Sequence, residues 1–252
     1  MLKIRNLSKS FNKGTDFENV IFDDFNLNIE EKTSTALIGS NGCGKSTLLN
    51  LIAGTLEIDS GNICINEEDI SKLKENKRSK YIGRVYQDPS NGVSPSLTIL
   101  ENMALADNKN KKFNLSGLVD INRINYYKDL LKSLNLGLEN MLNSRVKFLS
   151  GGQRQSLSLI MATMNNPDLL LLDEHTASLD PKTSKVVMDK TKELINRNNM
   201  TTIMITHNMM DAIKYSDRVI MLDQGKIVFD EKSNDIDAED LDSLYKLNEN
   251  VA

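Results

Sequence analysis

A glycine-rich stretch around residue 40 carries the residue types that bind a polyphosphate. Its spacing fits G-x-x-x-x-G-K-[ST], and its place between an apolar run at 36–38 and a helical pattern from Leu48 favours this interpretation over a flexible turn. Glycines let the backbone approach phosphate oxygens closely, and consecutive N–H groups at a helix start attract an anion. We expect the Lys45 ammonium to contact the β- and γ-phosphates of ATP and the Ser46 hydroxyl to bind Mg²⁺. The predicted phosphate-binding loop consists of Gly39, Ser40, Asn41, Gly42, Cys43, Gly44, Lys45, Ser46 and Thr47.

Two adjacent acidic residues follow a second apolar run, the four leucines at 169–172. An aspartate at the end of a buried strand, here Asp173, is placed to hold Mg²⁺ through water or through Ser46. The neighbouring carboxylate of Glu174 projects in a different direction and is a candidate for polarising an attacking water. Two ordinary surface acids at a strand end are the alternative, which the phosphate-binding loop elsewhere in the chain makes less favourable.

A third candidate lies at Ser150, Gly151, Gly152 and Gln153, where a serine and a glutamine three residues apart predict a capping box. Two glycines at a capped helix start offer backbone N–H groups as a second nest for phosphate. An ordinary capped helix start is the alternative. One chain cannot easily direct both nests at one γ-phosphate, because we expect them at different edges of the fold.

These candidates need rigid elements to position them, and the hydrophobic pattern predicts both strands and helices. Strands are expected at 2–7, 20–29, 33–38, 62–65, 81–86, 169–172 and 202–206, with a turn at 59–61 and a hairpin joining 219–222 to 226–229. Helices are expected from Lys45 to near Gly54, from Ser150 to about Met164, from Asp180 onward and at 209–215. This alternation predicts an α/β fold: a P-loop NTPase core with a mostly parallel sheet, antiparallel β strands and an inserted helical subdomain.

The hydrophobic pattern changes between residues 88 and 149, where apolar residues recur at helical spacing and Thr98 with Glu101 predicts a capping box. We therefore predict one domain over 1–230, with its core at 1–87 and 150–230 and the helical subdomain at 88–149. A C-terminal helical tail is expected at 231–252.

Composition narrows the class of protein. Among 252 residues, 39% are hydrophobic and 26% charged, as in ordinary globular proteins. The net charge of −4 argues against a nucleic-acid partner, and no apolar run approaches the 18 residues of a membrane span. Without a signal-peptide pattern, and with only Cys43 and Cys64 as cysteines, we expect a reducing, cytoplasmic setting. The phosphate nest and Lys45 predict a lowered thiol pKa and high reactivity for Cys43, and a strand position predicts burial for Cys64.

The sequence at 149–153, Leu-Ser-Gly-Gly-Gln, resembles the signature of ATP-binding cassette (ABC) ATPases, and further motifs follow in the order of that family over residues 1–230. The resemblance implies an ABC ATPase fold and an ATP- and Mg²⁺-dependent ATPase. It also implies a Walker A motif at 39–46 and a D-loop at 178–180. By this resemblance, Phe11 stacks on adenine and Gln87 contacts water and Mg²⁺. Asp173 is the Walker B carboxylate and Glu174 the catalytic carboxylate. Asp180 belongs to the D-loop, and His207 is the switch histidine.

The resemblance also implies partners. ABC ATPases form head-to-tail dimers, here a homodimer or a heterodimer, in which each phosphate-binding loop faces the partner's signature. We expect an importer subunit at the cytoplasmic face of the membrane, with a separate permease, an extracytoplasmic substrate-binding protein and an amino-acid-type substrate. The alternatives are a soluble ABC ATPase acting on ribosomes or nucleic acid, and a generic P-loop kinase.

Two positions depart from the family pattern. His175 stands where a proline usually follows the catalytic glutamate, and Asn208 stands where an aspartate often follows the switch histidine. His175 is expected either to loosen the turn toward Asp180 or to add a titratable group beside the site.

Overall fold

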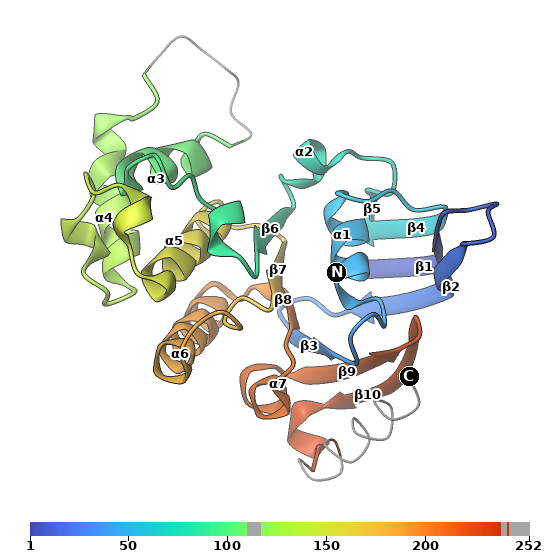
Figure 1. Ribbon diagram of the computed structural model, residues 1–252. Helices are drawn as coiled ribbons and strands as arrows, with labels where there is room; N and C mark the ends of the chain where they lie inside the picture. The colour runs from blue at the N-terminus through green and yellow to red at the C-terminus, as the bar shows by residue number, and fades with distance from the viewer. Residues whose placement is uncertain (110–116, 238–240, 242–252) are drawn as a thin grey trace.

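The computed structural model describes residues 1–109, 117–237 and 241. Figure 1 shows two β-sheets on one side of the molecule and a group of helices on the other. Three hydrophobic clusters hold these parts together. The predicted α/β fold with an inserted helical part is confirmed.

The six-stranded sheet carries the elements that end at the candidate site residues. Its strand order is β10-β9-β3-β8-β7-β6. All neighbours are parallel except β9 and β10, which form the predicted hairpin. The strands are β3 (Ser34–Ile38), β6 (Ile82–Val85), β7 (Leu169–Asp173), β8 (Thr201–Ile205), β9 (Arg218–Asp223) and β10 (Lys226–Lys232).

The second sheet is antiparallel and has the order β2-β1-β4-β5. Its strands are β1 (Leu2–Phe11), β2 (Asn19–Ile29), β4 (Ser60–Ile65) and β5 (Glu68–Asp69). The expected turn at 59–61 is wrong for its last two residues, because Ser60 already pairs with Ser8 of β1. Gly61 has φ +93°, and a Cβ there would lie 2.4 Å from the Asn6 carbonyl oxygen. A close strand approach, and not a turn, therefore requires this glycine.

Seven α-helices in the described part of the chain cover the sheets and build the helical lobe. They are α1 (Lys45–Ala53), α2 (Glu75–Arg78), α3 (Ile99–Asp107), α4 (Ile124–Lys132), α5 (Gly151–Thr163), α6 (Pro181–Asn198) and α7 (Met209–Tyr215). Short 3₁₀ turns lie at Pro89–Asn91, Ile121–Arg123, Leu138–Asn140, Val146–Phe148 and Ser233–Asp235. Both predicted capping boxes are present, at the starts of α3 and α5.

The two faces of the six-stranded sheet contribute to different cores, because side chains alternate along a strand. In β7, Leu169 and Leu171 pack with α1 and the antiparallel sheet, whereas Leu170 and Leu172 pack with residues of α5, α6 and α7. All four leucines are fully buried. A strand covered on both faces has no solvent side to carry polar residues, which explains the uninterrupted leucine run.

The helical lobe has its own hydrophobic cluster, which includes Leu157, Ile160 and Met164 from the end of α5 and just beyond it. Its packing therefore continues past the predicted subdomain boundary at 149. At the other end of the chain, β10 continues to Lys232, past the predicted boundary at 230. The helical tail predicted over 231–252 falls mostly outside the described residues and stays a prediction, as do the domain boundaries.

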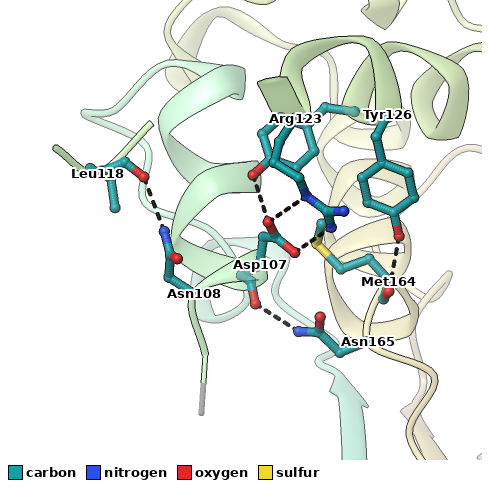
Figure 2. Close-up of polar contacts among 9 residues, drawn as sticks. Asp107, Asn108, Leu118, Arg123, Tyr126, Met164 and Asn165 are labelled. Carbon is teal, nitrogen blue, oxygen red and sulfur yellow. Dashed lines mark hydrogen bonds and ion pairs between the residues drawn. The ribbon is translucent and has the colours of Figure 1, made fainter. Parts of the chain in front are cut away.

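A polar network fastens the ends of α3, α4 and α5 together (Figure 2). The buried Asp107 carboxylate accepts hydrogen bonds from the Arg123 guanidinium at 2.7 and 2.9 Å and from the Tyr127 hydroxyl at 2.9 Å. Burial and Asp107 together raise the pKa of Tyr127 to about 12. The Asn165 amide donates to the Ala106 carbonyl at 2.7 Å, which ties the end of α5 to α3. The network makes the far end of the lobe one packed unit.

Candidate active site

Parallel strands bring the candidate residues to one edge of the sheet. The phosphate-binding loop follows β3, His207 follows β8, Glu174 follows β7 and Gln87 follows β6. Since β3, β8, β7 and β6 are parallel neighbours in that order, these residues all lie at the carboxyl ends of adjacent strands. Ligands of open α/β sheets bind at this edge.

The phosphate-binding loop needs glycine for two different reasons. Gly39, Gly42 and Gly44 have φ values of +143°, +83° and +110°, where other residues are strained. A Cβ on Gly39 would lie 2.2 Å from the Leu222 carbonyl oxygen, and one on Gly44 would lie 2.9 Å from the Phe22 ring. At Gly42, by contrast, a Cβ meets no described atom within 4 Å, so this glycine faces open space.

Lys45 is the fixed cation of the loop. Its side chain is buried, and its ammonium donates to the carbonyl oxygens of Gly39 at 2.7 Å and Ser40 at 2.8 Å. The loop is thus held closed around the position that a phosphate would take. Helix α1 begins at Lys45, and the first amides of a helix have no acceptor within the helix. These amides, the helix dipole and Lys45 fit a phosphate.

The residues also fit Mg²⁺. Ser46 is exposed at the start of α1, and Asp173 is the last residue of β7. Among the described residues, no group of three or more His, Cys, Asp or Glu side chains gathers to hold a metal by itself. Mg²⁺ retains several waters and uses one or two protein oxygens together with phosphate oxygens, so a sparse oxygen set of this kind suits it.

Glu174 and His207 lie in direct contact. The Glu174 Oε1 atom is 2.6 Å from His207 Nε2, and the glutamate side chain is 14% exposed against 39% for the histidine. The Glu174 backbone has φ +44° and its N–H donates to the Ile205 carbonyl at 3.2 Å. This left-handed residue turns the chain at the end of β7, so that Glu174 leaves the strand direction and its side chain meets His207.

Asp173 has a partner that the sequence patterns did not reveal. Its Oδ2 atom accepts a hydrogen bond from Arg84 Nη2 at 3.1 Å, and the Arg84 guanidinium lies 4.6 Å from the centre of the Tyr86 ring. The pairing register places Arg84 of β6 beside Leu171 of β7, two residues before Asp173. Two neighbouring strands are needed to create this ion pair, and no spacing within one segment signals it.

The signature residues form a helix start that packs against α6. The Ser150 hydroxyl accepts from the Gln153 N–H at 3.2 Å, and the Gln153 side chain accepts from the Ser150 N–H at 3.0 Å. A Cβ on Gly152 would lie 2.3 Å from Thr183 Cγ2, and one on Gly151 would lie 3.2 Å from Leu179. Close packing against α6 therefore requires glycine at 152, whether or not phosphate binds there.

Three further predicted residues lie apart from the contacts above. Asp180 caps α6 by accepting from the Thr183 N–H at 3.1 Å. Hydrogen bonding from the Thr183 side chain and, next, from its backbone lowers the pKa of Asp180. Phe11 ends β1 and is half-buried, with the Lys9 ammonium 5.5 Å from its ring centre. Gln87 is exposed just past β6. In Figure 1, α1 lies beside the antiparallel sheet and α5 on the helical side, so the predicted second nest is on a different part of the molecule.

The expectation for the two cysteines is wrong. Cys43 is 5% exposed, and burial raises the pKa of its thiol despite Lys45, whose ammonium is 3.9 Å from Sγ. Cys64 is the more accessible of the two, and burial raises its pKa as well. The Cys43 side chain is buried and packs with the first hydrophobic cluster. Within the loop, the backbone and not this thiol is available to an anion.

His175 is a buried titratable group beside the site. Its side chain is 1% exposed and its Nε2 atom lies 3.1 Å from the Thr191 hydroxyl of α6. Because that hydroxyl donates to the Val187 carbonyl at 2.8 Å, His175 must supply the hydrogen between them. Burial lowers the pKa of His175 to about 4. The residue therefore stays neutral and fastens the chain after Glu174 to α6.

Fold and site together define a P-loop ATPase with the sheet order and inserted helical lobe of an ATP-binding cassette. Comparison with known proteins agrees, since residues 22–177 match the family model described as ABC transporter. The chain belongs to this family.

Two relatives and two solved structures illustrate the similarity. A tyrosine transport ATP-binding protein of Clostridioides difficile is 47% identical over 93% of both chains. A phosphonates import ATP-binding protein of Ruegeria is 33% identical over 97% of this chain and 94% of its own. An ATP-binding cassette solved as a dimer with ADP and phosphate has a TM-score of 0.78 at 31% identity, covering 92% of this chain and 99% of that one. A cassette from the Clostridium perfringens cbiONQ transporter has the same TM-score at 28% identity, covering 95% and 91%.

Across the described residues, no helix combines the length and the apolar composition that crossing a bilayer requires.

Proposed function

We propose that this chain hydrolyses ATP as the nucleotide-binding subunit of an importer that moves an amino-acid-type substrate through a separate permease. The contact between Glu174 and His207, at the sheet edge that also carries the phosphate-binding loop, is the observation that carries the ATPase part. A carboxylate in hydrogen-bonding distance of an imidazole, beside a phosphate site, is suited to proton transfer from water.

Each residue has a task in this proposal. The loop amides and Lys45 bind the β- and γ-phosphates. Ser46, Asp173 and Gln87 would hold Mg²⁺, which would neutralise charge that develops on the phosphates. Glu174 accepts a proton from the attacking water. His207 carries a hydrogen on Nε2, which faces Glu174 and holds its carboxylate in place.

A second copy, or a related cassette, completes the site. Ser150 and Gly151 lie at the start of α5. Figure 1 shows α5 away from α1 in the same chain, so we propose that these residues act on the nucleotide of a head-to-tail partner. The similar cassette that was solved as a dimer with ADP and phosphate supports this arrangement. Phe11 and Asp180 are assigned here to adenine stacking and to the dimer contact beside the phosphate.

The names of the relatives support the transport role. Several are import ATP-binding proteins, and the relative at 47% identity is named for tyrosine transport. We propose a separate permease, an extracytoplasmic substrate-binding protein and a position at the cytoplasmic face of the membrane. None of these names supports the alternative of a cassette acting on ribosomes or nucleic acid.

The test is to isolate the chain with its associated proteins from native membranes and to identify the co-purifying polytopic protein. The complex, reconstituted in vesicles with ATP and labelled tyrosine, should show ATP-dependent transport in the import direction, which Lys45→Ala abolishes. Co-purification with ribosomal proteins instead of a polytopic membrane protein would contradict the proposal. ATP-dependent transport of phosphonate or spermidine but not tyrosine would refute the substrate class alone.

A further inference from the structure

Arg84 is a cation placed against the carboxylate that is assigned to Mg²⁺. Its Nη2 atom lies 3.1 Å from Asp173 Oδ2, and the two side chains are only 11% and 16% exposed. Charges in such a poorly solvated position interact more strongly than on the surface. The negative charge of Asp173 is therefore compensated from within the chain.

The pair with Asp173 does not satisfy all the hydrogen-bond donors of the Arg84 guanidinium. Its Nε atom is buried and has no hydrogen-bond partner among the described residues. A buried donor without a partner is unfavourable, so the pairing with Asp173 is retained at a cost. Arg123 differs, because both its Nε and its Nη2 atoms donate to Asp107.

Arg84 also has space to leave Asp173. Together with Tyr86 it lines a groove of about 670 Å³ between the sheet and the helical lobe, which residues of α3 and α5 complete. The Tyr86 ring, 4.6 Å from the guanidinium, offers a face on which the cation can remain when the carboxylate is withdrawn. The groove and the ring therefore offer the guanidinium space away from Asp173.

We propose that Arg84 is a built-in counter-ion of Asp173 that competes with Mg²⁺, so that metal and nucleotide must displace the guanidinium before the carboxylate can serve the site. The idea rests on the proposed role of Asp173 in holding Mg²⁺. A cation next to Asp173 lowers the attraction of that carboxylate for a second cation. Arg84 then compensates the charge of Asp173 until Mg²⁺ binds and sets the Mg²⁺ concentration at which binding occurs.

The test measures Mg²⁺ binding without hydrolysis. The purified chain is titrated with Mg²⁺ at a fixed concentration of a fluorescent, non-hydrolysable ATP analogue, and the half-saturating Mg²⁺ concentration is read from the fluorescence. Arg84→Met keeps the apolar stem of the side chain and removes the charge, so the half-saturating concentration should fall about 5-fold or more, the lower end of ordinary coupling between sites. Arg84→Lys keeps the charge and should remain within about 2-fold of the wild type.

Arg218→Met is the matched control. Arg218 of β9 also forms an ion pair with an aspartate, here a bidentate one with Asp230 of β10, and it lies far from β7 in the strand order. This variant should leave the half-saturating Mg²⁺ concentration unchanged. An unchanged or increased value in Arg84→Met would overturn the proposal, because it would make Arg84 a brace or an orienting group for Asp173. If the wild type bound the analogue without any Mg²⁺ dependence, the proposed metal site itself would fail, together with this inference.

A second measurement is made on the wild-type chain and needs a variant only to assign one signal. The guanidinium signals of ¹⁵N-arginine-labelled protein are recorded, and the Arg84 signal is assigned by its loss in Arg84→Lys. Addition of Mg²⁺ and the analogue should speed the exchange of the Arg84 protons with water, because the bond to Asp173 is released. Slower or unchanged exchange would contradict the competition.

Discussion

Glu174 Oε1 and His207 Nε2 lie 2.6 Å apart, although 32 residues separate them in sequence. Adjacent parallel strands create this contact, since β7 ends at Asp173 and β8 ends at Ile205, which is the register partner of Asp173. Two strands that end level with each other carry their next residues to the same place. The left-handed backbone of Glu174 then turns its side chain toward the histidine.

The first prediction concerns this contact. Glu174→Gln retains the shape and the hydrogen-bonding distance to His207 but cannot accept a proton, so ATP hydrolysis should slow by about 10²-fold or more. ATP binding, measured by equilibrium titration, should stay within about 2-fold, because the substitution removes an interaction with the attacking water and not a contact that binds ATP. The control is Glu193→Gln, an exposed residue of α6 that should leave turnover unchanged. Near-normal hydrolysis in Glu174→Gln would exclude the base role.

The second prediction concerns the two thiols. Since Cys43 is buried and burial raises its pKa, iodoacetamide at pH 8 should modify the more accessible Cys64 faster. Mass spectrometry of the intact chain over time gives both rates, with Cys64→Ser and Cys43→Ala used for assignment. Faster modification of Cys43 than of Cys64 would contradict this prediction and indicate a thiol activated by the phosphate-binding loop.

The third prediction concerns pH. The pKa of His175 is lowered to about 4 in the folded chain, whereas an unfolded histidine titrates near 6.5. The unfolded state therefore binds more protons between these values, so this contribution to stability is complete above about pH 6.5 and declines as the pH falls toward 4. Between pH 7.5 and pH 5 it amounts to about 2 kcal/mol.

His175→Gln provides the comparison for this pH effect, because glutamine does not titrate and can still donate a hydrogen bond to Thr191. Free energies of unfolding from urea titrations at pH 7.5 and pH 5 should show a smaller loss for the variant than for the wild type, by about 2 kcal/mol. Equal losses in both proteins would show that His175 is not the group responsible.

The fourth prediction concerns the shared site. Ser150→Arg adds bulk and charge where a partner's phosphate should lie, so it should abolish hydrolysis while its own loop still binds ATP. Lys45→Ala removes the loop cation and should lower ATP affinity at least about tenfold. Thr98→Ala, which removes the matching cap of α3, is the control for the loss of a capping interaction and should leave hydrolysis intact.

Mixing the Ser150→Arg and Lys45→Ala chains sharpens this test. In a mixed dimer both defects fall on one composite site, and the other site pairs an intact loop with an intact signature. Trapping with a non-hydrolysable analogue should then leave one nucleotide per mixed dimer. Nucleotide occupancy that does not depend on the partner would contradict a composite site.

Local sequence was sufficient for features that depend on neighbouring residues. The spacing of glycines with Lys45 predicted the loop before α1, and the Ser150 and Gln153 pair predicted its capping box. The leucine run at 169–172 predicted a strand buried on both faces. Each depends on backbone conformation or on side-chain alternation within one segment, which a few consecutive residues determine.

Tertiary structure alone decided which distant groups meet. The Arg84–Asp173 pair depends on the alignment of β6 with β7, and glycine at 152 depends on Thr183 of α6. The sequence placed Cys43 correctly in the loop but did not reveal the burial of its thiol, which packing against the first hydrophobic cluster sets. The sequence therefore determined the chemical groups and their segments, whereas burial, pKa direction and partner choice arose from strand order and helix packing. Burial, pKa direction and partner choice each depend on many contacts between residues far apart in the chain, so no local sequence pattern predicts them.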